Sequence, residues 1–260
     1  MKSVVFAVIA FLFCALPSQR VLAFAGEPDP TFGQGGISIL PDWLPASPFD
    51  HANKVAIQPD GKIIIVGRAG GDTSGIWRAA FAVIRLNPDG TLDQSFGPDG
   101  DGYFIFPWAQ GPAEAHAVLI DPDGDIVVGG DVANLAGVAW LTPGGVLDTG
   151  KGDNGLMTFA INNDTVNTTT INAMTIENRI SNGYQLDFAG SYDGNGYPQM
   201  ALGSYVPTDP ISSGYNPILA AVVPPGTNGN GVATALLDDQ DVGVIVGGYV
   251  QNSAGSPSAW

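Results

Sequence analysis

A strand–turn–strand segment that occurs twice constrains the fold more than any other feature of this 260-residue chain. The first copy runs from Ala56 to Gly67 and the second from Leu119 to Gly129, each with a Pro-Asp-Gly turn between two apolar runs. Proline pre-sets φ, aspartate suits a turn, and glycine takes the positive φ that a hairpin often needs. The returning run is β-branched and does not alternate with polar residues, so we expect a strand that is covered on both faces.

Two weaker copies of this hairpin follow, and they end at Gly190 and Gly247. Together with Gly67 and Gly129, these glycines are spaced by 62, 61 and 57 residues. Units of this length that hold about four strands are typical of β-propeller blades. The sequence therefore predicts an all-β, β-propeller-like fold with about four blades of about 60 residues. A β-sandwich is the alternative, although its strands would recur every ~8–12 residues without a longer repeat.

Four units can be superimposed within a repeat domain that spans residues 26–260: about 29–90, 91–146, 147–208 and 209–260. In the first two units a Gly-rich opening leads into a short strand, Ile37 to Leu40 or Tyr103 to Phe106. The third opening has Lys151 where the second has Phe96, which predicts a buried Phe96 and an exposed Lys151. The fourth unit has no recognisable opening, so we expect either an open or incomplete four-blade arc or self-association through an open blade edge, rather than a sealed monomeric ring. The alternative is a fragment of a longer propeller.

The first 25 residues have the features of a secretory signal peptide. Lys2 supplies the positive end, an uncharged run follows from Val4 to Leu16, and Ala23-Phe24-Ala25 gives a cleavage pattern, with cleavage after Ala23 as the alternative. The run is shorter than the ~20 residues of a membrane helix, so we expect no membrane span in the mature chain. The chain is therefore predicted to be secreted, either to the periplasm or outside the cell. A disulfide-free secreted domain fits a bacterium, because the single cysteine, Cys14, lies in this leader.

The formal net charge of −16 argues against two classes of partner. Nucleic acids and anionic membranes are bound by clustered Lys and Arg, which this chain lacks. We therefore expect no nucleic-acid partner, and the partner predicted is a protein or a glycan.

Three carboxylates occur within five residues at Asp121, Asp123 and Asp125. Calcium takes six to eight oxygen ligands, and acidic loops often supply them. The spacing is not that of an EF-hand, and the equivalent turn of the first unit, Gln58 to Lys62, has one carboxylate. We therefore interpret this segment, like 99–102 and 238–241, as an acidic turn, and assign no metal ligand and no cofactor.

No catalytic motif is found, and no catalytic residue is assigned. His51 lies ten residues before Gly61 and His116 lies eight before Gly124, so they do not match in the repeat and are expected to be hydrogen-bonded structural residues. Ser38 and Ser95 occupy repeat positions, and nothing resembles the Gly-x-Ser-x-Gly pattern of hydrolases. Paired carboxylates of the glycosidase type stay open, because their pairing is spatial.

The tryptophans support either packing or a sugar-binding surface. Trp43 and Trp77 fall in predicted loops, where binding residues gather. Trp140 and Trp260 follow their hairpins, as packing residues would, and packing is the interpretation preferred for the five, which include Trp108.

Three runs resemble the delta-60 repeat family of bacterial secreted proteins: Ala56 to Ile63, Phe81 to Gly90 and Thr91 to Gly97. The resemblance covers about residues 29–150 well and is faint beyond. It implies a tandem propeller repeat in an exported protein, and the family has no established catalytic residues to transfer. The function predicted is a secreted, non-catalytic propeller that acts as a scaffold or binding module. The alternative is a secreted hydrolase, or a calcium-dependent adhesin, with a site at the propeller mouth.

Overall fold

The computed structural model describes residues 26–39, 50–70, 79–106, 108, 110–161, 166–179, 183–193, 198–206, 218–222, 231–239, 243–251 and 257–259. The chain forms two compact units, 1–39 and 40–260. In the first, residues 26–39 form turns closed by backbone hydrogen bonds and one bridge between Gly33 and Ile37. The predicted strand from Ile37 to Leu40 is therefore wrong over residues 37–39, which form no strand. The predicted signal peptide and Leu40 lie outside the described residues.

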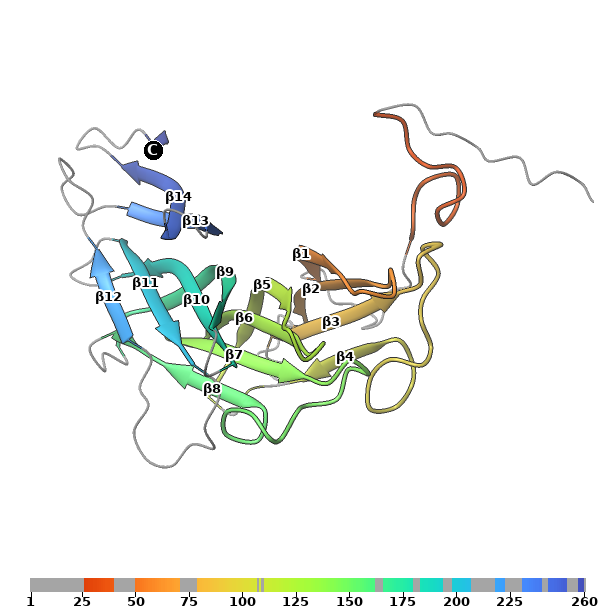
Figure 1. Cartoon of the computed structure of the whole chain (residues 1–260), viewed down its shortest axis with the longest axis horizontal. Helices are drawn as coiled ribbons and strands as arrows, with labels where there is room; N and C mark the ends of the chain where they lie inside the picture. The colour runs from red at the N-terminus through yellow and green to blue at the C-terminus, as the bar shows by residue number, and fades with distance from the viewer. Residues whose placement is uncertain are drawn as a thin grey trace, which may run out of the picture. The chain divides into compact units, whose positions relative to one another are not determined.

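The second unit contains four antiparallel sheets, and its described residues contain no α-helix (Figure 1). Sheet 1 consists of β1 (His51–Ile57), β2 (Ile63–Ala69), β3 (Ala80–Leu86) and β4 (Tyr103–Phe106). Sheet 2 consists of β5 (Ala113–Ile120), β6 (Ile126–Val132), β7 (Leu135–Leu141) and β8 (Leu156–Phe159). Sheet 3 consists of β9 (Thr169–Arg179), β10 (Gly183–Tyr192), β11 (Gln199–Tyr205) and β12 (Ile218–Val222). Sheet 4 consists of β13 (Gly231–Asp239), β14 (Gly243–Gln251) and β15 (Pro257–Ala259).

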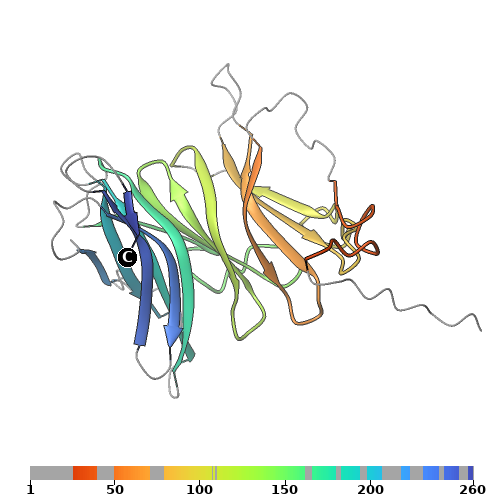
Figure 2. The same ribbon diagram turned by 90° about the horizontal axis from the view of Figure 1, so that it is seen from above.

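Each sheet pairs its strands in chain order, which is the strand order of a propeller blade. The predicted all-β, propeller-like fold is therefore confirmed. The extensive contacts between described strands link each sheet to the next, including β1 to β5, β5 to β9 and β9 to β13, and the sheets do not close into a ring (Figure 2). The first strands of neighbouring sheets therefore lie beside one another on the inner side of the second unit.

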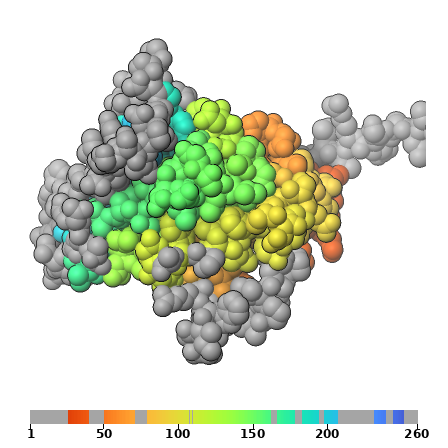
Figure 3. Space-filling model, turned by 90° about the horizontal axis from the view of Figure 1, so that it is seen from below, coloured from red at the N-terminus to blue at the C-terminus, as the bar shows by residue number. Residues whose placement is uncertain are grey.

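Apolar residues fill the seams between consecutive sheets, as expected for blades that cannot bury their faces alone. Between sheets 1 and 2, Ile64 and Phe81 lie in one cluster with Ile126 and Val128. Figure 3 shows residues of these two sheets packed together on one face. Between sheets 2 and 3 the cluster contains Trp140 and Phe188, among others. Among the described residues, the cluster between sheets 3 and 4 contains three buried ones, Ala189, Met200 and Ala233.

The last strand of a sheet follows the opening motif of the next sequence unit. Tyr103 to Phe106, predicted as a strand of the second unit, is β4 and pairs with β3 as the outer strand of sheet 1. β8 likewise follows the third opening and completes sheet 2. After β3 the chain turns at Asn87–Gly90, passes through the opening, and returns antiparallel to β3. The sheets are therefore offset along the chain from the sequence repeats.

Every first strand contains a β-bulge at an equivalent residue: Asn53, His116, Asn172 and Thr234. A glycine of the second strand faces each bulge: Gly67, Gly130, Gly190 and Gly248. A Cβ at any of these glycines would collide with a carbonyl oxygen of the first strand. The register shows that Gly130 and Gly248 correspond to Gly67, so the alignment based on Gly129 and Gly247 is wrong by one residue. Adjacent glycines in both copies hid this shift from the sequence comparison.

Candidate functional site

The bulges of β1 and β5 bring together polar residues that are far apart in sequence. The group contains His51, Asn53, Arg68, Glu114, His116 and Asp131, and we call it the inner-strand cluster. His51 and Asn53 come from β1, and Glu114 and His116 from β5. These two first strands contact each other, so the cluster bridges sheets 1 and 2. The histidines, which sequence spacing treated as unrelated, are therefore neighbours of the same carboxylate.

Glu114 is the centre of the inner-strand cluster. Its Oε1 lies 2.6 Å from His51 Nε2 and accepts a hydrogen bond of 2.9 Å from Asn53 Nδ2. Its Oε2 lies 3.6 Å from an Arg68 Nη1. Burial by itself raises the pKa of Glu114, but the hydrogen bonds from Asn53 and His51 outweigh it and hold the pKa below its ordinary value. Glu114 is therefore a charged hydrogen-bond acceptor rather than a proton donor at neutral pH.

His116 is oriented by a second carboxylate. Its Nε2 lies 2.6 Å from Asp131 Oδ1, and its Nδ1 lies 3.4 Å from Asn53 Nδ2. Because Nε2 donates to Asp131, Nδ1 is the acceptor in the neutral ring. The side chains of both residues are about a quarter exposed, at 24% and 26%. The predicted hydrogen bonds of both histidines are present, and the sequence interpretation missed that the two histidines lie beside the same carboxylate, Glu114.

Asn53 links the two sheets through a backbone contact that recurs along the chain. Its Nδ2 donates to the carbonyl oxygen of Ala115, at 2.8 Å. Asn172, at the bulge of β9, donates in the same way to the carbonyl oxygen of Ala233 on β13, at 3.0 Å. The signal was present in the sequence, because His51 and Glu114, like Asn53 and His116, are separated by 63 residues, the distance between Gly67 and Gly130.

The acidic turn after β5 surrounds a lysine. Lys151 Nζ lies 2.7 Å from Oδ2 of Asp121, 2.7 Å from Oδ2 of Asp125 and 3.4 Å from Oδ2 of Asp123. The Tyr184 hydroxyl donates to Asp121 Oδ2 at 2.7 Å. Burial by itself lowers the pKa of Lys151, but the hydrogen bonds to Asp121 and Asp125 raise it above the ordinary value. The predicted exposure of Lys151 is wrong: its side chain is 14% exposed, because the ammonium group fills the space between the carboxylates.

The ammonium group takes the position that a cation would need in this turn. In the part of the chain that the structure describes, no group of three or more His, Cys, Asp or Glu side chains has the arrangement of a metal site. Asp99 and Asp101 lie in a turn before β4, and Asp238 lies in β13. Asp241 lies outside the described residues.

A second charged network joins the first hairpin to the second opening motif. Asp93 Oδ2 lies 2.7 Å from Arg85 Nε and 2.8 Å from Lys62 Nζ, and Ser95 Oγ donates to Asp93 Oδ1 at 2.7 Å. Burial by itself raises the pKa of Asp93, but the hydrogen bonds from Lys62 and Ser95 and the charge of Arg85 hold it well below its ordinary value. The Arg85 guanidinium carbon lies 4.7 Å from the centre of the Phe96 ring, and Phe96 is fully buried, as predicted. Ser95 is therefore part of a structural turn.

Two of the five tryptophans, Trp108 and Trp140, lie among the described residues. Trp108 and Trp140 are both at most 5% exposed. Trp108 packs edge-on to Phe81, with ring centres 5.3 Å apart, and the ring of Trp140 lies 5.7 Å from that of Tyr205. The prediction of packing is confirmed for these two. Trp43, Trp77 and Trp260 lie outside the described residues.

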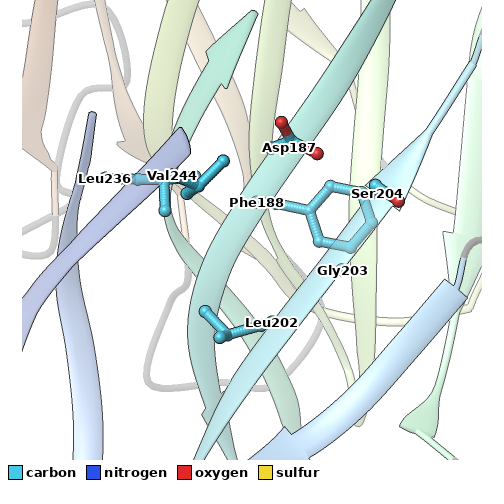
Figure 4. Close-up of a pocket in the computed structure, with 7 residues that line it drawn as sticks. All are labelled: Asp187, Phe188, Leu202, Gly203, Ser204, Leu236 and Val244. Carbon is cyan, nitrogen blue, oxygen red and sulfur yellow. The ribbon is translucent and has the colours of Figure 1, made fainter. Parts of the chain in front are cut away.

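A cavity of about 280 Å³ lies between sheets 3 and 4 (Figure 4). Its lining residues come from β10, β11, β13 and β14: Asp187, Phe188, Leu202, Gly203, Ser204, Leu236 and Val244. Asp187 occupies the position of Ile64 in sheet 1 and of Val127 in sheet 2. Sheet 3 therefore carries a charged side chain beside this cavity, at a position where sheets 1 and 2 carry apolar ones.

Comparison with known proteins gives one family match. The family described as a domain of unknown function (DUF5122) beta-propeller matches residues 58–96. The match begins at the first hairpin turn and ends at Phe96, so it contains the Lys62–Arg85–Asp93 network. This supports a propeller-type repeat, and no curated protein matches the chain.

Among solved structures, the chain is similar to a GH43 glycoside hydrolase. That enzyme was engineered in its active site and displays endo-xylanase and exo-arabinofuranosidase activity. The identity is 12% and the TM-score 0.35, and the match covers 80% of this chain and 39% of the hydrolase chain.

The described part of the chain contains no helix that is long and apolar enough to cross a bilayer.

Proposed function

We propose that this chain is a secreted, non-catalytic propeller repeat domain of the delta-60 kind, and that it binds a protein or a glycan. The observation that carries the proposal is that the charged groups at the centres of the three polar clusters are each held by several partners. Lys151 is bound by the acidic turn, Asp93 is bound by Arg85 and Lys62, and Glu114 is bound by His51 and Asn53. Carboxylates held charged by several donors are poor general acids, and they are well suited to fixing a rigid surface.

The inner-strand cluster is the binding surface that we favour. Its side chains remain partly exposed: that of Glu114 is 20% exposed and that of His51 is 45% exposed. They present imidazole, amide, carboxylate and guanidinium groups at the inner strands of two consecutive sheets. Polar groups held in place by a rigid sheet recognise a ligand with little loss of side-chain entropy.

Glycan and peptide arrays test the proposal directly. We expect the protein to bind one class of probe, and we expect Glu114→Gln to reduce that binding, because it removes the charge that orients His51 and Asn53. Glu27→Gln, in the first unit, is the matched control. Absence of binding on both arrays, or equal loss with the two variants, would contradict the proposal.

The same protein separates the rival functions. We expect chelator or added calcium to leave the melting curve unchanged, because Lys151 already binds the oxygens of the acidic turn. A calcium-dependent melt would support the adhesin instead. Hydrolysis of chromogenic glycosides that is abolished by Glu114→Gln would support the hydrolase. Export is tested by intact mass, and a mass that still contains residues 1–20 would refute cleavage after Ala25.

A further inference from the structure

The two ends of the row of sheets expose apolar residues that belong to a repeating interface. On sheet 1, Val55 is 55% exposed and Ile57 is 68% exposed. They pair across the strands with Ile65 and Ile63, and Ile65 pairs with Ile84 of β3. Directly opposed residues of an antiparallel pair share one face of the sheet. These five residues therefore form one surface, which we call the sheet-1 outer face.

The equivalent residues of sheet 2 show what such a face is built to contact. They follow from the same strand pairing: Val118, Ile120, Ile126, Val128 and Ala139. All five pack into the core cluster that also holds Ile64, Val66, Phe81 and Val83 of sheet 1. In sheet 2, therefore, this face is covered by the face of the preceding blade. In sheet 1 the same pattern of β-branched residues has no preceding blade among the described residues.

Sheet 4 exposes the complementary surface, which corresponds to the face that an earlier sheet packs against the sheet that follows it. Leu237 is 59% exposed and Ile245 is 45% exposed, and they pair with each other across β13 and β14. Their equivalents in sheet 2 are Leu119 and Val127, which also pair with each other and pack against sheet 3. Ala235, which is also exposed, lies opposite Gly247 on the same face. We call this surface the sheet-4 outer face.

We propose that the sheet-4 outer face of one copy of the chain packs on the sheet-1 outer face of a second copy, in the manner of consecutive blades. Each copy carries both halves of the interface, so two such contacts join two copies of four sheets into a closed ring. An eight-bladed ring lies within the size range of propellers. A head-to-tail contact of this kind forms a closed assembly when its rotation closes. The proposal does not depend on the proposed ligand-binding function.

The dependence of association on salt distinguishes this apolar contact from an ionic one, because the protein is strongly acidic. Each copy carries a formal charge of −16, so two copies repel at low ionic strength. Salt screens that repulsion without weakening apolar burial, and we therefore expect association to strengthen as salt is added.

Charge substitutions on the two faces test the proposal by sedimentation equilibrium over a range of protein concentrations. We expect the unaltered protein to be a dimer. Ile57→Lys and Leu237→Lys should each be monomeric, with a dissociation constant raised by roughly 100-fold or more, because each buries an unpaired ammonium group. Val166→Lys is the matched control, because Val166 is 80% exposed and lies on neither face.

Mixing the two variants tests the head-to-tail arrangement itself. Ile57→Lys retains a normal sheet-4 outer face and Leu237→Lys retains a normal sheet-1 outer face, so the mixture should form a dimer that neither variant forms alone. Circular dichroism checks that the variants are folded. Val55→Lys replaces Ile57→Lys, and Ile245→Lys replaces Leu237→Lys, if either of the first variants is unfolded. A monomeric unaltered protein, a dimeric Leu237→Lys, dissociation by Val166→Lys, association that weakens with salt, or a mixture that stays monomeric would each overturn the proposal.

Discussion

A cation and an aromatic side chain occupy two equivalent positions at neighbouring seams, but in exchanged order: Arg85 and Phe96 at the first seam, Trp140 and Lys151 at the second. The backbone hydrogen bonds at these positions are the same at both seams. Asp93 N donates to the carbonyl oxygen of Arg85, and Asp148 N donates in the same way to that of Trp140. Trp140 therefore takes the place of Arg85. Lys151 takes the place of Phe96 by the same criterion, since each donates its backbone N–H to the aspartate three residues earlier.

The hairpins beside these two seams also differ in charge: the first hairpin carries a lysine where the second carries an aspartate. Lys62 of the first hairpin corresponds to Asp125 of the second, and Gln58 corresponds to Asp121. The cation comes from the hairpin and from β3 at the first seam, and from the opening loop at the second. Lys151 is thus explained by the carboxylates that it neutralises, and not by loss of a consensus residue.

We expect Lys151→Ala to destabilise the protein about as much as Phe96→Ala. Removing one partner of a buried ion pair costs about 3–5 kcal/mol, because charges such as Asp121 stay buried without compensation. Truncating a buried Phe costs about 3–5 kcal/mol. Lys54→Ala, at an exposed lysine of β1, should change stability by less than about 0.5 kcal/mol. Urea denaturation measures all three, and a Lys151→Ala midpoint equal to that of Lys54→Ala would contradict the role of the ammonium group.

Asp93 makes part of the stability depend on acid pH. Its pKa is held well below the value of about 3.9 that it has in an unfolded chain. A depressed carboxyl pKa contributes stability that is present above the unfolded pKa and is lost as the pH falls through the folded pKa. We therefore expect Asp93→Asn to cost about 3 kcal/mol at pH 7, with Arg85 and Lys62 left without their carboxylate, and less as the pH falls below about 4.

Urea titrations of the unaltered protein and the variant between neutral pH and about pH 2 measure this difference. Asp99→Asn, at an exposed aspartate of a turn, is the control. A stability difference between unaltered protein and Asp93→Asn that stays constant across this range would show that the carboxylate does not act through its charge.

The first strand and its bulge are the element that determines how one sheet meets the next. At the bulges of β1 and β9, the side chains of Asn53 and Asn172 donate to the first strand of the next sheet. The glycine opposite the bulge lets the first strand approach without a Cβ in the way. Bulge and glycine therefore form one structural unit of the repeat.

We expect Gly130→Ala to destabilise the protein by about 1–3 kcal/mol, because the new methyl group would meet the carbonyl oxygen of Glu114 and force the strands apart. Gly144→Ala is the control. A Cβ there meets nothing closer than Thr142 Oγ1, at 3.9 Å, and its φ is not positive. It should be neutral or slightly stabilising. Thermal melting compares the two, and equal melting temperatures would show that the close approach at the bulge is not required.

At the scale of the whole molecule, the repeat in the sequence predicted the fold, because turn residues such as Gly61 and the β-branched run after it are local signals. It did not predict which sheet the strand Tyr103–Phe106 would join, since that pairing links residues across a sequence-unit boundary. It also missed the environment of Lys151, whose partners lie 26 to 30 residues away along the chain. The inner-strand cluster was missed for the same reason, because it forms only when β1 and β5 lie side by side.

The unequal seams predict an unequal distribution of local stability. β6 lies between two well-filled seams, whereas β14 contacts one seam with three buried residues and a cavity beside Val244. Regions with few buried apolar contacts open at lower free energy than the core. We therefore expect the amides of Val244 to Gly248 to exchange with solvent roughly tenfold or more faster than those of Ile126 to Gly130.

Hydrogen exchange followed by mass spectrometry measures this difference, and Leu237→Lys is the appropriate protein because its sheet-4 outer face cannot be covered by a second copy. If the dimer proposal holds, the unaltered protein should protect β14 more than this variant does and leave β6 unchanged, since only the sheet-4 and sheet-1 outer faces are buried by association. Equal protection of β14 and β6 in the variant would mean that sheet 4 is stabilised by contacts other than its seam with sheet 3. The difference in exchange between β14 and β6 tests the packing of the fourth sheet whether or not two copies associate, because both strands are measured within the same Leu237→Lys variant.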